Sequence, residues 1–145
     1  MTTIALVSCV KSKRSEASPA SDLYTSPLFK GLSAYATAKS DAWYVISAKY
    51  GLVRPNQILE PYELTLNQMP RAKQREWATR VWAQISVVLP PAAHVIVLAG
   101  ANYRRDLVPL LRHHGFAVSI PFEGLSFGRQ LARLKALSQS GFRDD

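Results

Sequence analysis

The sequence holds a single cysteine, few carboxylates and no long apolar run. Because Cys9 has no second cysteine to pair with, an internal disulfide framework and a cysteine-based zinc cluster are both excluded. The longest apolar runs, at residues 87–89 and 95–99, are far too short to span a bilayer. Nothing at the start of the chain resembles a signal sequence. We therefore expect a cytoplasmic protein without a membrane partner.

Basic residues outnumber acidic ones. The chain has 18 Lys and Arg against 10 Asp and Glu, which gives a formal net charge of +8 and a sequence pI near 9.9. A positive field concentrates polyanions near a protein and speeds their capture. We therefore expect a nucleic acid, DNA rather than RNA, or a nucleotide as the partner. Basic charge that serves solubility alone is the alternative.

The length of 145 residues suits one domain, and the sequence shows no internal repeat and no linker, so residues 1–145 are expected to form a single α/β domain. Short apolar runs that predict strands alternate with amphipathic stretches that predict helices. The predicted strands are residues 3–8, 42–47, 94–99 and 116–120, and the predicted helices are residues 27–39, 71–89, 101–113 and 126–138. This alternation predicts a three-layer sandwich, in which a mainly parallel sheet of about four strands is flanked by helices.

Two long connections interrupt the alternation. Residues 9–26 are rich in Ser, Lys and Ala, and residues 53–68 contain two prolines and show no clear periodicity. Long connections inside a compact domain are often functional, and we expect both to be structured loops.

Three of the predicted strands end in polar or glycine-containing segments. In an open α/β sheet, ligands bind outside the carboxyl ends of the strands. The candidate binding and catalytic residues in these segments are Ser8, Cys9, Lys11 and Lys13 after the first strand, Ser47, Lys49, Tyr50 and Gly51 after the second, and Gly100 and Tyr103 after the third. Their convergence at one edge of the sheet is the main indication of a site.

Lys11, Lys13 and Lys49 suit an anionic guest. Each can hold a phosphate as a point charge. A lysine kept in a partly apolar place can instead lose its proton and act as a nucleophile or base. Ordinary solvated loop lysines are the competing interpretation.

Few carboxylates are available for acid–base chemistry. Glu60 and Glu63 lie in the second long connection, and Glu123 lies in the loop at residues 121–124. Either loop can deliver a general acid or base to the strand ends, and a solvated surface position is the alternative. The three histidines do not have the spacing of a metal set, so we expect neither a metal ion nor a cofactor.

Four tyrosines fall in different loops on the same predicted edge, namely Tyr24, Tyr50, Tyr62 and Tyr103. Aromatic rings in such a place can stack on a nucleobase. Core packing with a hydrogen-bonded hydroxyl is the competing explanation. Cys9, which follows a buried strand, is interpreted as a small hydrophobic residue, with a reactive thiolate beside Lys11 as the alternative.

Several separated motifs are similar to those of a known family. They are Val-Ser-Cys-Val-Lys-Ser-Lys at 7–13, Asp-Leu-Tyr-Thr-Ser at 22–26, Ile-Ser-Ala-Lys-Tyr-Gly-Leu at 46–52, Glu-Pro-Tyr at 60–62 and Pro-Phe-Glu-Gly at 121–124. Over about residues 4–134 they resemble a family of small bacterial and phage proteins of unassigned function. Residues 46–62 also resemble the peroxide-stress YaaA proteins and, more faintly, the core domain of archaeosine synthases.

These resemblances carry functional implications. Similarity to YaaA implies DNA binding and protection of DNA against oxidative damage. Similarity to the archaeosine synthases implies handling of a modified 7-deazaguanine base through a lysine. Structural kinship with uracil-DNA-glycosylase-like folds is a further implication.

Three functional hypotheses follow. The leading one is an enzyme acting on a nucleobase, such as a DNA glycosylase or lyase for damaged or modified bases, which takes the base out of the stack and holds it in a pocket. In that enzyme Lys49, Glu123 and Lys11 are the expected catalytic residues, and the tyrosines stack on the base. The alternatives are a non-catalytic DNA-binding protein of stress response or repair, and an enzyme acting on free nucleotides.

Overall fold

The protein is described by a computed structural model that covers residues 2–9 and 13–142. Within these residues the main sheet has five strands in the order β4-β3-β1-β6-β7. Their bounds are Thr3–Ser8 for β1, Ala42–Ser47 for β3, Gly51–Val53 for β4, His94–Leu98 for β6 and Ala117–Ser119 for β7. β1 runs parallel to β3 and β6, and β7 runs parallel to β6, whereas β4 is antiparallel to β3.

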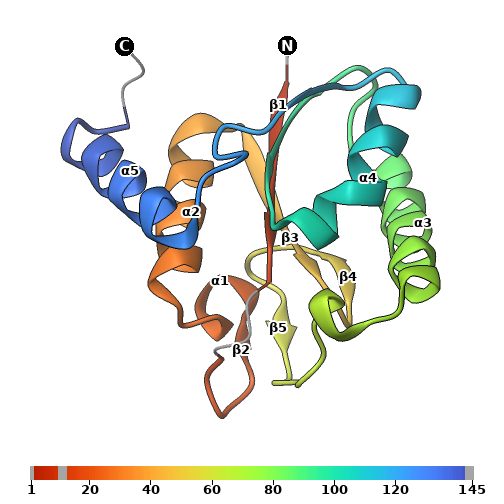
Figure 1. The fold of residues 1–145 in the computed structure, drawn as a ribbon, viewed down its shortest axis with the longest axis horizontal. Helices are drawn as coiled ribbons and strands as arrows, with labels where there is room; N and C mark the ends of the chain where they lie inside the picture. The colour runs from red at the N-terminus through yellow and green to blue at the C-terminus, as the bar shows by residue number, and fades with distance from the viewer. Residues whose placement is uncertain (1, 10–12, 143–145) are drawn as a thin grey trace.

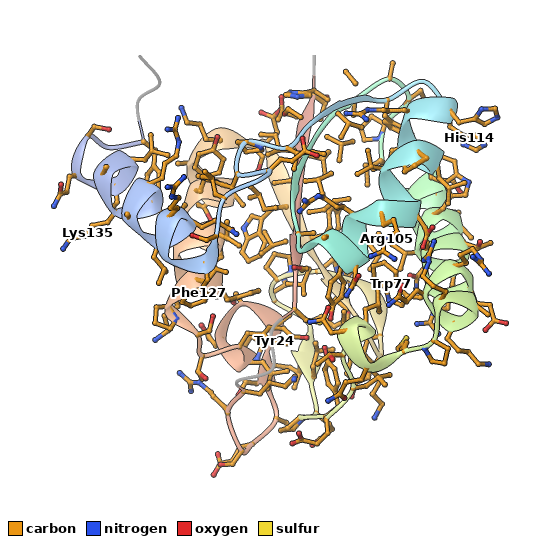
Figure 2. The ribbon with its side chains drawn as sticks, viewed as in Figure 1. Tyr24, Trp77, Arg105, His114, Phe127 and Lys135 are labelled. Atoms are coloured by element: carbon orange, nitrogen blue, oxygen red, sulfur yellow. The ribbon has the colours of Figure 1, made fainter. Side chains whose placement is uncertain are left out.

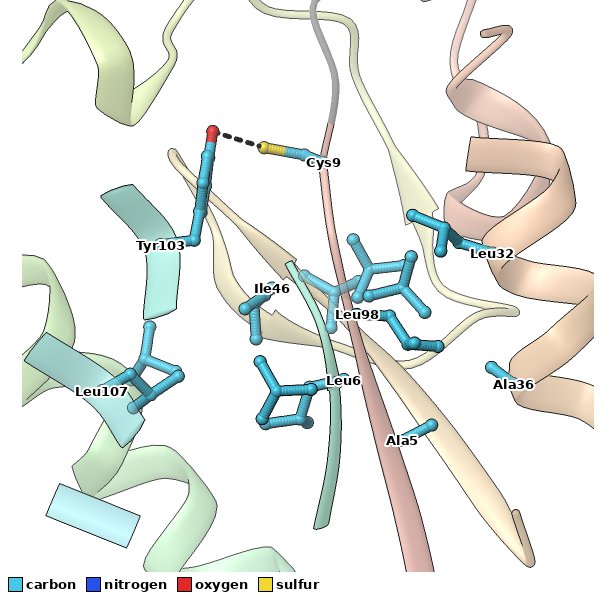
Figure 3. Packing of buried hydrophobic residues seen from close by; sticks show 14 of the residues in the cluster. Ala5, Leu6, Cys9, Leu32, Ala36, Ile46, Leu98, Tyr103 and Leu107 are labelled. Carbon is cyan, nitrogen blue, oxygen red and sulfur yellow. Dashed lines mark hydrogen bonds between the residues drawn. The ribbon is translucent and has the colours of Figure 1, made fainter. Parts of the chain in front are cut away.

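The apolar runs of the two central strands, β1 and β6, are buried on both faces of the sheet almost along their whole length. In β1 the side chain of Leu6 is fully buried, and its register neighbours are Tyr44 in β3 and Val97 in β6. Leu107 packs on one face of the sheet, while Leu32 and Ala36 pack on the other (Figure 3). The hydrophobic core therefore lies in two layers, one on each side of β1.

Helices cover both faces of the sheet (Figure 1). One face carries α2 (Pro27–Lys39) and α5 (Phe127–Gln139), and the other carries α3 (Arg71–Val88) and α4 (Ala101–His113). The predicted α/β three-layer sandwich is thereby confirmed. Its sheet has one strand more than the apolar runs indicated, because β4 is too short to show a periodic pattern. No helix in the described ranges combines the length and apolarity needed to cross a membrane.

The two long connections are paired with each other at the carboxyl edge of the sheet. Short strands β2 (Ser18–Pro19) and β5 (Ile58–Leu59) form an antiparallel ladder. The ladder leads into a short helix, α1 (Ala20–Leu23), which is hydrogen-bonded to the second connection through Ala20 N–H and the Gln57 carbonyl at 2.8 Å. A 3-10 turn, η1 (Leu66–Gln68), precedes α3. Sequence patterns missed these elements, since segments of two to four residues carry no period.

The path of the chain through the sheet places a topological switch point between β1 and β6. The chain leaves β1 through α2 on one face of the sheet, and it leaves the adjacent β6 through α4 on the opposite face. The helices therefore diverge beyond the carboxyl ends of these two strands, which is where open α/β sheets form ligand crevices.

α5 is attached less firmly than the other long helices. It contacts mainly α2, and Leu134 is its one buried residue among those described. Leu134 packs over Gly31, where an added Cβ would come within 3.0 Å of its Cδ1. A second cavity of about 350 Å³ separates parts of α2 and α5.

Candidate functional site

A cavity of about 740 Å³ lies at the switch point. Ser8, Cys9, Leu98 and Ala99, from the ends of β1 and β6, form part of its lining. The N-terminal parts of α2, α4 and α5 and the segment after β7 supply most of the rest, and Asn67 of the turn before α3 also lines it. Ligand pockets have volumes of about 300–1,000 Å³ and occur preferentially at such switch points. The cavity is therefore the leading candidate for a small-molecule site.

One side of the cavity is suited to an anion. Gly100 precedes α4, and its N–H donates to Ser8 Oγ at 3.3 Å. No described side chain caps α4, and its first turn lines the cavity, so the positive end of the helix dipole lies beside it. The half-buried Arg104 also lines the cavity, and its guanidinium donates to the Ala99 carbonyl at 2.9 Å. That bond fixes one N–H of the guanidinium and leaves further donors for a ligand.

The opposite side is mainly apolar. Leu28 and Leu32 of α2 line it together with Ile120, Phe122 and Leu125 from the segment after β7. Phe127, the first residue of α5, also lines it although 57% of the residue is exposed. The cavity thus joins a polar, positive side to an apolar side.

Cys9 connects the cavity with the interior of the domain. Its Sγ lies 3.1 Å from Tyr103 Oη and accepts a hydrogen bond from Ala48 N–H at 3.4 Å (Figure 3). The Tyr103 hydroxyl accepts from Leu66 N–H at 3.3 Å, and burial raises the pKa of Tyr103 above its ordinary value. The thiol is therefore held among β1, β3 and α4 by neutral partners.

A second polar group lies beside the cavity, and we call it the hydroxyl cluster: Tyr24, Ser47 and Tyr62. Tyr62 Oη lies 2.6 Å from Tyr24 Oη and 2.6 Å from Ser47 Oγ. Ser47 Oγ also accepts from the N–H groups of Lys49 and Tyr50, at 3.2 and 3.1 Å. All three cluster residues are buried, and burial raises the pKa of both tyrosines. The cluster ties the two long connections to the end of β3.

Lys13 covers this cluster. Its Nζ lies 4.4 Å from the ring centroid of Tyr62 and 5.7 Å from that of Tyr24, distances at which an ammonium is attracted to an aromatic face. Burial lowers the pKa of Lys13, and the charges of Cys9 and Glu63 oppose that shift. Lys13 therefore contacts the tyrosines of the cluster and is not among the residues that line the cavity.

The predicted site residues separate into several groups. Ser8, Cys9, Gly100 and Tyr103 line the cavity, whereas Lys13, Tyr24, Ser47 and Tyr62 form or cover the hydroxyl cluster. Lys11 lies outside the described residues. The rings of Tyr24, Tyr62 and Tyr103 are buried and engaged with neighbouring side chains, so core packing accounts for them better than stacking on a base.

The remaining predicted residues lie away from the cavity lining. Lys49 is exposed, with its Nζ 5.3 Å from the ring centroid of Tyr50, and the Tyr50 hydroxyl donates to the Glu60 carbonyl at 3.2 Å. Gly51 has a φ of +74° and serves the turn into β4. Glu123 is exposed, although its neighbours on both sides line the cavity. The strand-end rule placed these residues at the correct edge but could not give the direction of their side chains.

Sequence reasoning missed Arg104 and Phe127, which give the cavity its positive charge and its exposed aromatic ring. Arg104 falls in the predicted helix at residues 101–113 and Phe127 in the predicted helix at residues 126–138, and the sequence patterns assign neither of them a role in a site. The signal available for Arg104 was its place in the first turn after a strand-end glycine. No group of three or more His, Cys, Asp or Glu within the described ranges is arranged to hold a metal ion.

Comparison with known proteins gives a family and no function. Searches of the curated proteins and of the solved structures gave no match. The model of a family of unknown function, DUF6884, matches residues 4–136, which is most of the chain. The chain therefore belongs to the DUF6884 family.

Proposed function

We propose that the protein binds a small phosphorylated molecule of the nucleotide class in the cavity between β1 and β6. The observation that carries this proposal is the position of Arg104 and the start of α4, which no described side chain caps, at one side of a ligand-sized cavity. Helix starts bind phosphates through backbone N–H groups and the helix dipole. A guanidinium adds charge-assisted hydrogen bonds to the same oxygens. Ser8, Gly100 and Arg104 are the residues we assign to the phosphate.

The net charge supports an anionic ligand as well. A net charge of +8 raises the concentration of anions near the protein. The cavity is open to solvent at the carboxyl edge of the sheet, so these anions can enter it. The volume of about 740 Å³ exceeds what a free phosphate needs and suits a ligand with a further, less polar part.

Binding is better supported than a particular reaction. Among the described residues, the side chains that line the cavity include the hydroxyl of Ser8 and the thiol of Cys9, but no Lys, His, Asp or Glu. Base removal by Lys49 or Glu123 draws no support from the positions of these two exposed side chains. Of the three hypotheses, the cavity favours the one with a free nucleotide as the ligand, and it supports binding without specifying a reaction.

The proposal is tested with a matched pair of variants at Gly100. This residue has φ −64° and ψ 161°, as an N-cap requires, and among the described residues an added Cβ would meet only Tyr103, at 3.9 Å. Gly100→Asn and Gly100→Asp should both cap α4 and keep or slightly raise its stability. Only Gly100→Asp places a negative charge where the phosphate is expected.

Isothermal titration calorimetry with nucleoside monophosphates supplies the readout. We expect Gly100→Asp to bind at least about tenfold more weakly than Gly100→Asn, because the carboxylate repels the phosphate at close range. Equal affinities for the two variants would contradict the assigned phosphate position. Failure of every nucleoside monophosphate to bind the wild-type protein would reject the proposal itself.

A second candidate is action on a base within DNA, which the charge distribution favours. Arg105 and Arg129 are exposed beside residues that line the cavity, and both can contact a phosphate backbone around an extruded base. The test is incubation with oligonucleotides that carry a broad panel of modified bases. Cleavage at one of them supports this candidate. Salt-dependent binding without cleavage supports a non-catalytic DNA-binding protein. If the protein neither cleaves nor binds the oligonucleotides, the free nucleotide is left as the ligand.

A further inference from the structure

We propose that the ligand carries an aromatic base and that α5 recognises it, with Phe127 stacking on the base. This inference rests on the proposed function, because it assigns the second half of a ligand whose phosphate lies near Arg104. It makes Phe127 a specificity-determining residue, through which the protein distinguishes nucleotides from sugar phosphates that lack a base.

The distribution of polar and apolar groups in the cavity gives the ligand a direction. Ser8 and Arg104 come from the sheet edge and from α4, whereas Ile120, Leu125 and Phe127 come from the segment that leads into α5. A ligand that satisfies both sides has an anionic end and a largely apolar end. A nucleotide has this form, since its base presents an apolar face and its phosphate carries the charge.

Phe127 is placed where a base can reach it. It is the only aromatic residue among the large hydrophobic residues exposed in the described part of the chain, and it lines the cavity. It lies at the start of α5, on a different part of the helix from Lys135 (Figure 2). The side chain of Ser126 caps the helix by accepting from Arg129 N–H at 3.3 Å, and this cap fixes the first turn that carries the ring.

Gln130 adds a polar contact at the same side. It lines the cavity one turn after Phe127, and its Nε2 donates to the Leu125 carbonyl at 3.0 Å. Its Oε1 accepts no hydrogen bond from any residue that the structure describes, so this atom can accept from an exocyclic amino group of a base. Phe127 would supply stacking, which tolerates any base, and Gln130 would favour bases that carry an amino group.

The experiment compares nucleotides with a ligand that has the same phosphate and sugar but no base. Wild-type protein, Phe127→Ala, Phe127→Trp and Ile58→Ala are titrated by calorimetry with nucleoside monophosphates and with ribose 5-phosphate. Ile58 is the matched control, because it is 63% exposed and does not line the cavity. Circular dichroism and thermal melting of each variant verify that the fold is kept.

We expect the wild-type protein to bind nucleotides at least about tenfold more tightly than ribose 5-phosphate. Phe127→Ala should weaken nucleotide binding by roughly 5- to 150-fold, the range for loss of one stacked base, and leave ribose 5-phosphate unaffected. Phe127→Trp should retain the affinity, and Ile58→Ala should match the wild type.

Two results would overturn the inference while leaving the proposed function intact. One is equal affinity of the wild-type protein for nucleotides and ribose 5-phosphate. The other is nucleotide binding by Phe127→Ala that equals that of Ile58→Ala. If neither class of ligand binds the wild-type protein, the proposed function fails, and the inference fails with it.

Discussion

The hydroxyl cluster and the cavity lie at the same edge of the sheet but have different roles. In the hydroxyl cluster, Tyr24 and Ser47 have no exposed surface and Tyr62 is only 8% exposed, and their hydroxyl groups satisfy one another. In the cavity, Phe127 is largely exposed and no side chain of the described residues caps the start of α4. The closed region uses its polar groups to hold the chain together, whereas the open one keeps donors and an apolar surface available. Recognisable motifs at a strand end can therefore serve the fold next to a site made of less conspicuous residues.

The largest expected effect is on the free energy of unfolding, which should fall much more for a substitution in the hydroxyl cluster than for one in the cavity. Tyr62→Ala should lower the free energy of unfolding by about 3–5 kcal/mol, because it opens a void and removes two buried hydrogen bonds. Tyr62→Phe should lower it by about 1–2 kcal/mol, through the hydrogen bonds alone. Phe127→Ala, which also truncates an aromatic ring, should change it by less than about 1 kcal/mol because that ring is exposed. Urea denaturation measures all three, and equal costs for Tyr62→Ala and Phe127→Ala would remove the distinction.

The second prediction separates the regions by binding. Arg104→Gln should weaken binding of a nucleoside monophosphate by roughly 10- to 150-fold, which corresponds to about 1.5–3 kcal/mol for a charge-assisted hydrogen bond. Its free energy of unfolding should change little, because the guanidinium makes one bond, to the Ala99 carbonyl, in the described structure. Arg105→Gln is the control, since the neighbouring Arg105 donates to Asn102 and does not line the cavity. Similar losses in both variants would indicate a general charge effect in place of a specific contact.

The smallest predicted effect concerns pH. Burial raises the pKa of Tyr62 above its ordinary value of 10.0, so its hydroxyl keeps its proton in the folded state after it has lost it in the unfolded state. The contribution of Tyr62 to the free energy of unfolding is complete below about pH 10. Above that pH it declines by about 1.4 kcal/mol per pH unit. Comparing the unfolding free energies of wild type and Tyr62→Phe from about pH 8 to about pH 11 isolates this contribution. A difference that stays constant across this range would show that Tyr62 ionises alike in both states.

Much of the fold could be predicted from the sequence. Residues 3–8 and 42–47 are apolar runs bounded by polar residues, and they form β1 and β3 with the predicted bounds. The start of α2 was also predicted, because the side chain of Ser26 caps the helix and Pro27 occupies its first position. Elements of two or three residues, such as β2 and β5, were missed because they depend on pairing between distant segments and not on a local pattern.

The candidate site was predicted only in its location. Ser8, Cys9, Gly100 and Tyr103 follow strands and line the cavity, as the strand-end rule implies. Lys49 follows a strand equally closely, yet its side chain lies over Tyr50 at the surface. Phe127 gave no signal at all, because an aromatic residue at the start of a helix fits core packing as well as ligand contact. Side-chain direction depends on tertiary packing, which the local sequence does not encode. The functional hypotheses remain predictions for the experiments above.

The weak attachment of α5 has a thermodynamic consequence for any ligand of the cavity. A helix anchored mainly by Leu134 over Gly31 can separate from α2 at a far lower free energy than global unfolding requires, and the sheet would stay intact while one wall of the cavity is lost. The apparent dissociation constant then equals the intrinsic one divided by the fraction of molecules with α5 docked. Neither Leu134 nor Gly31 lines the cavity, so a substitution at their contact would tune affinity through that fraction.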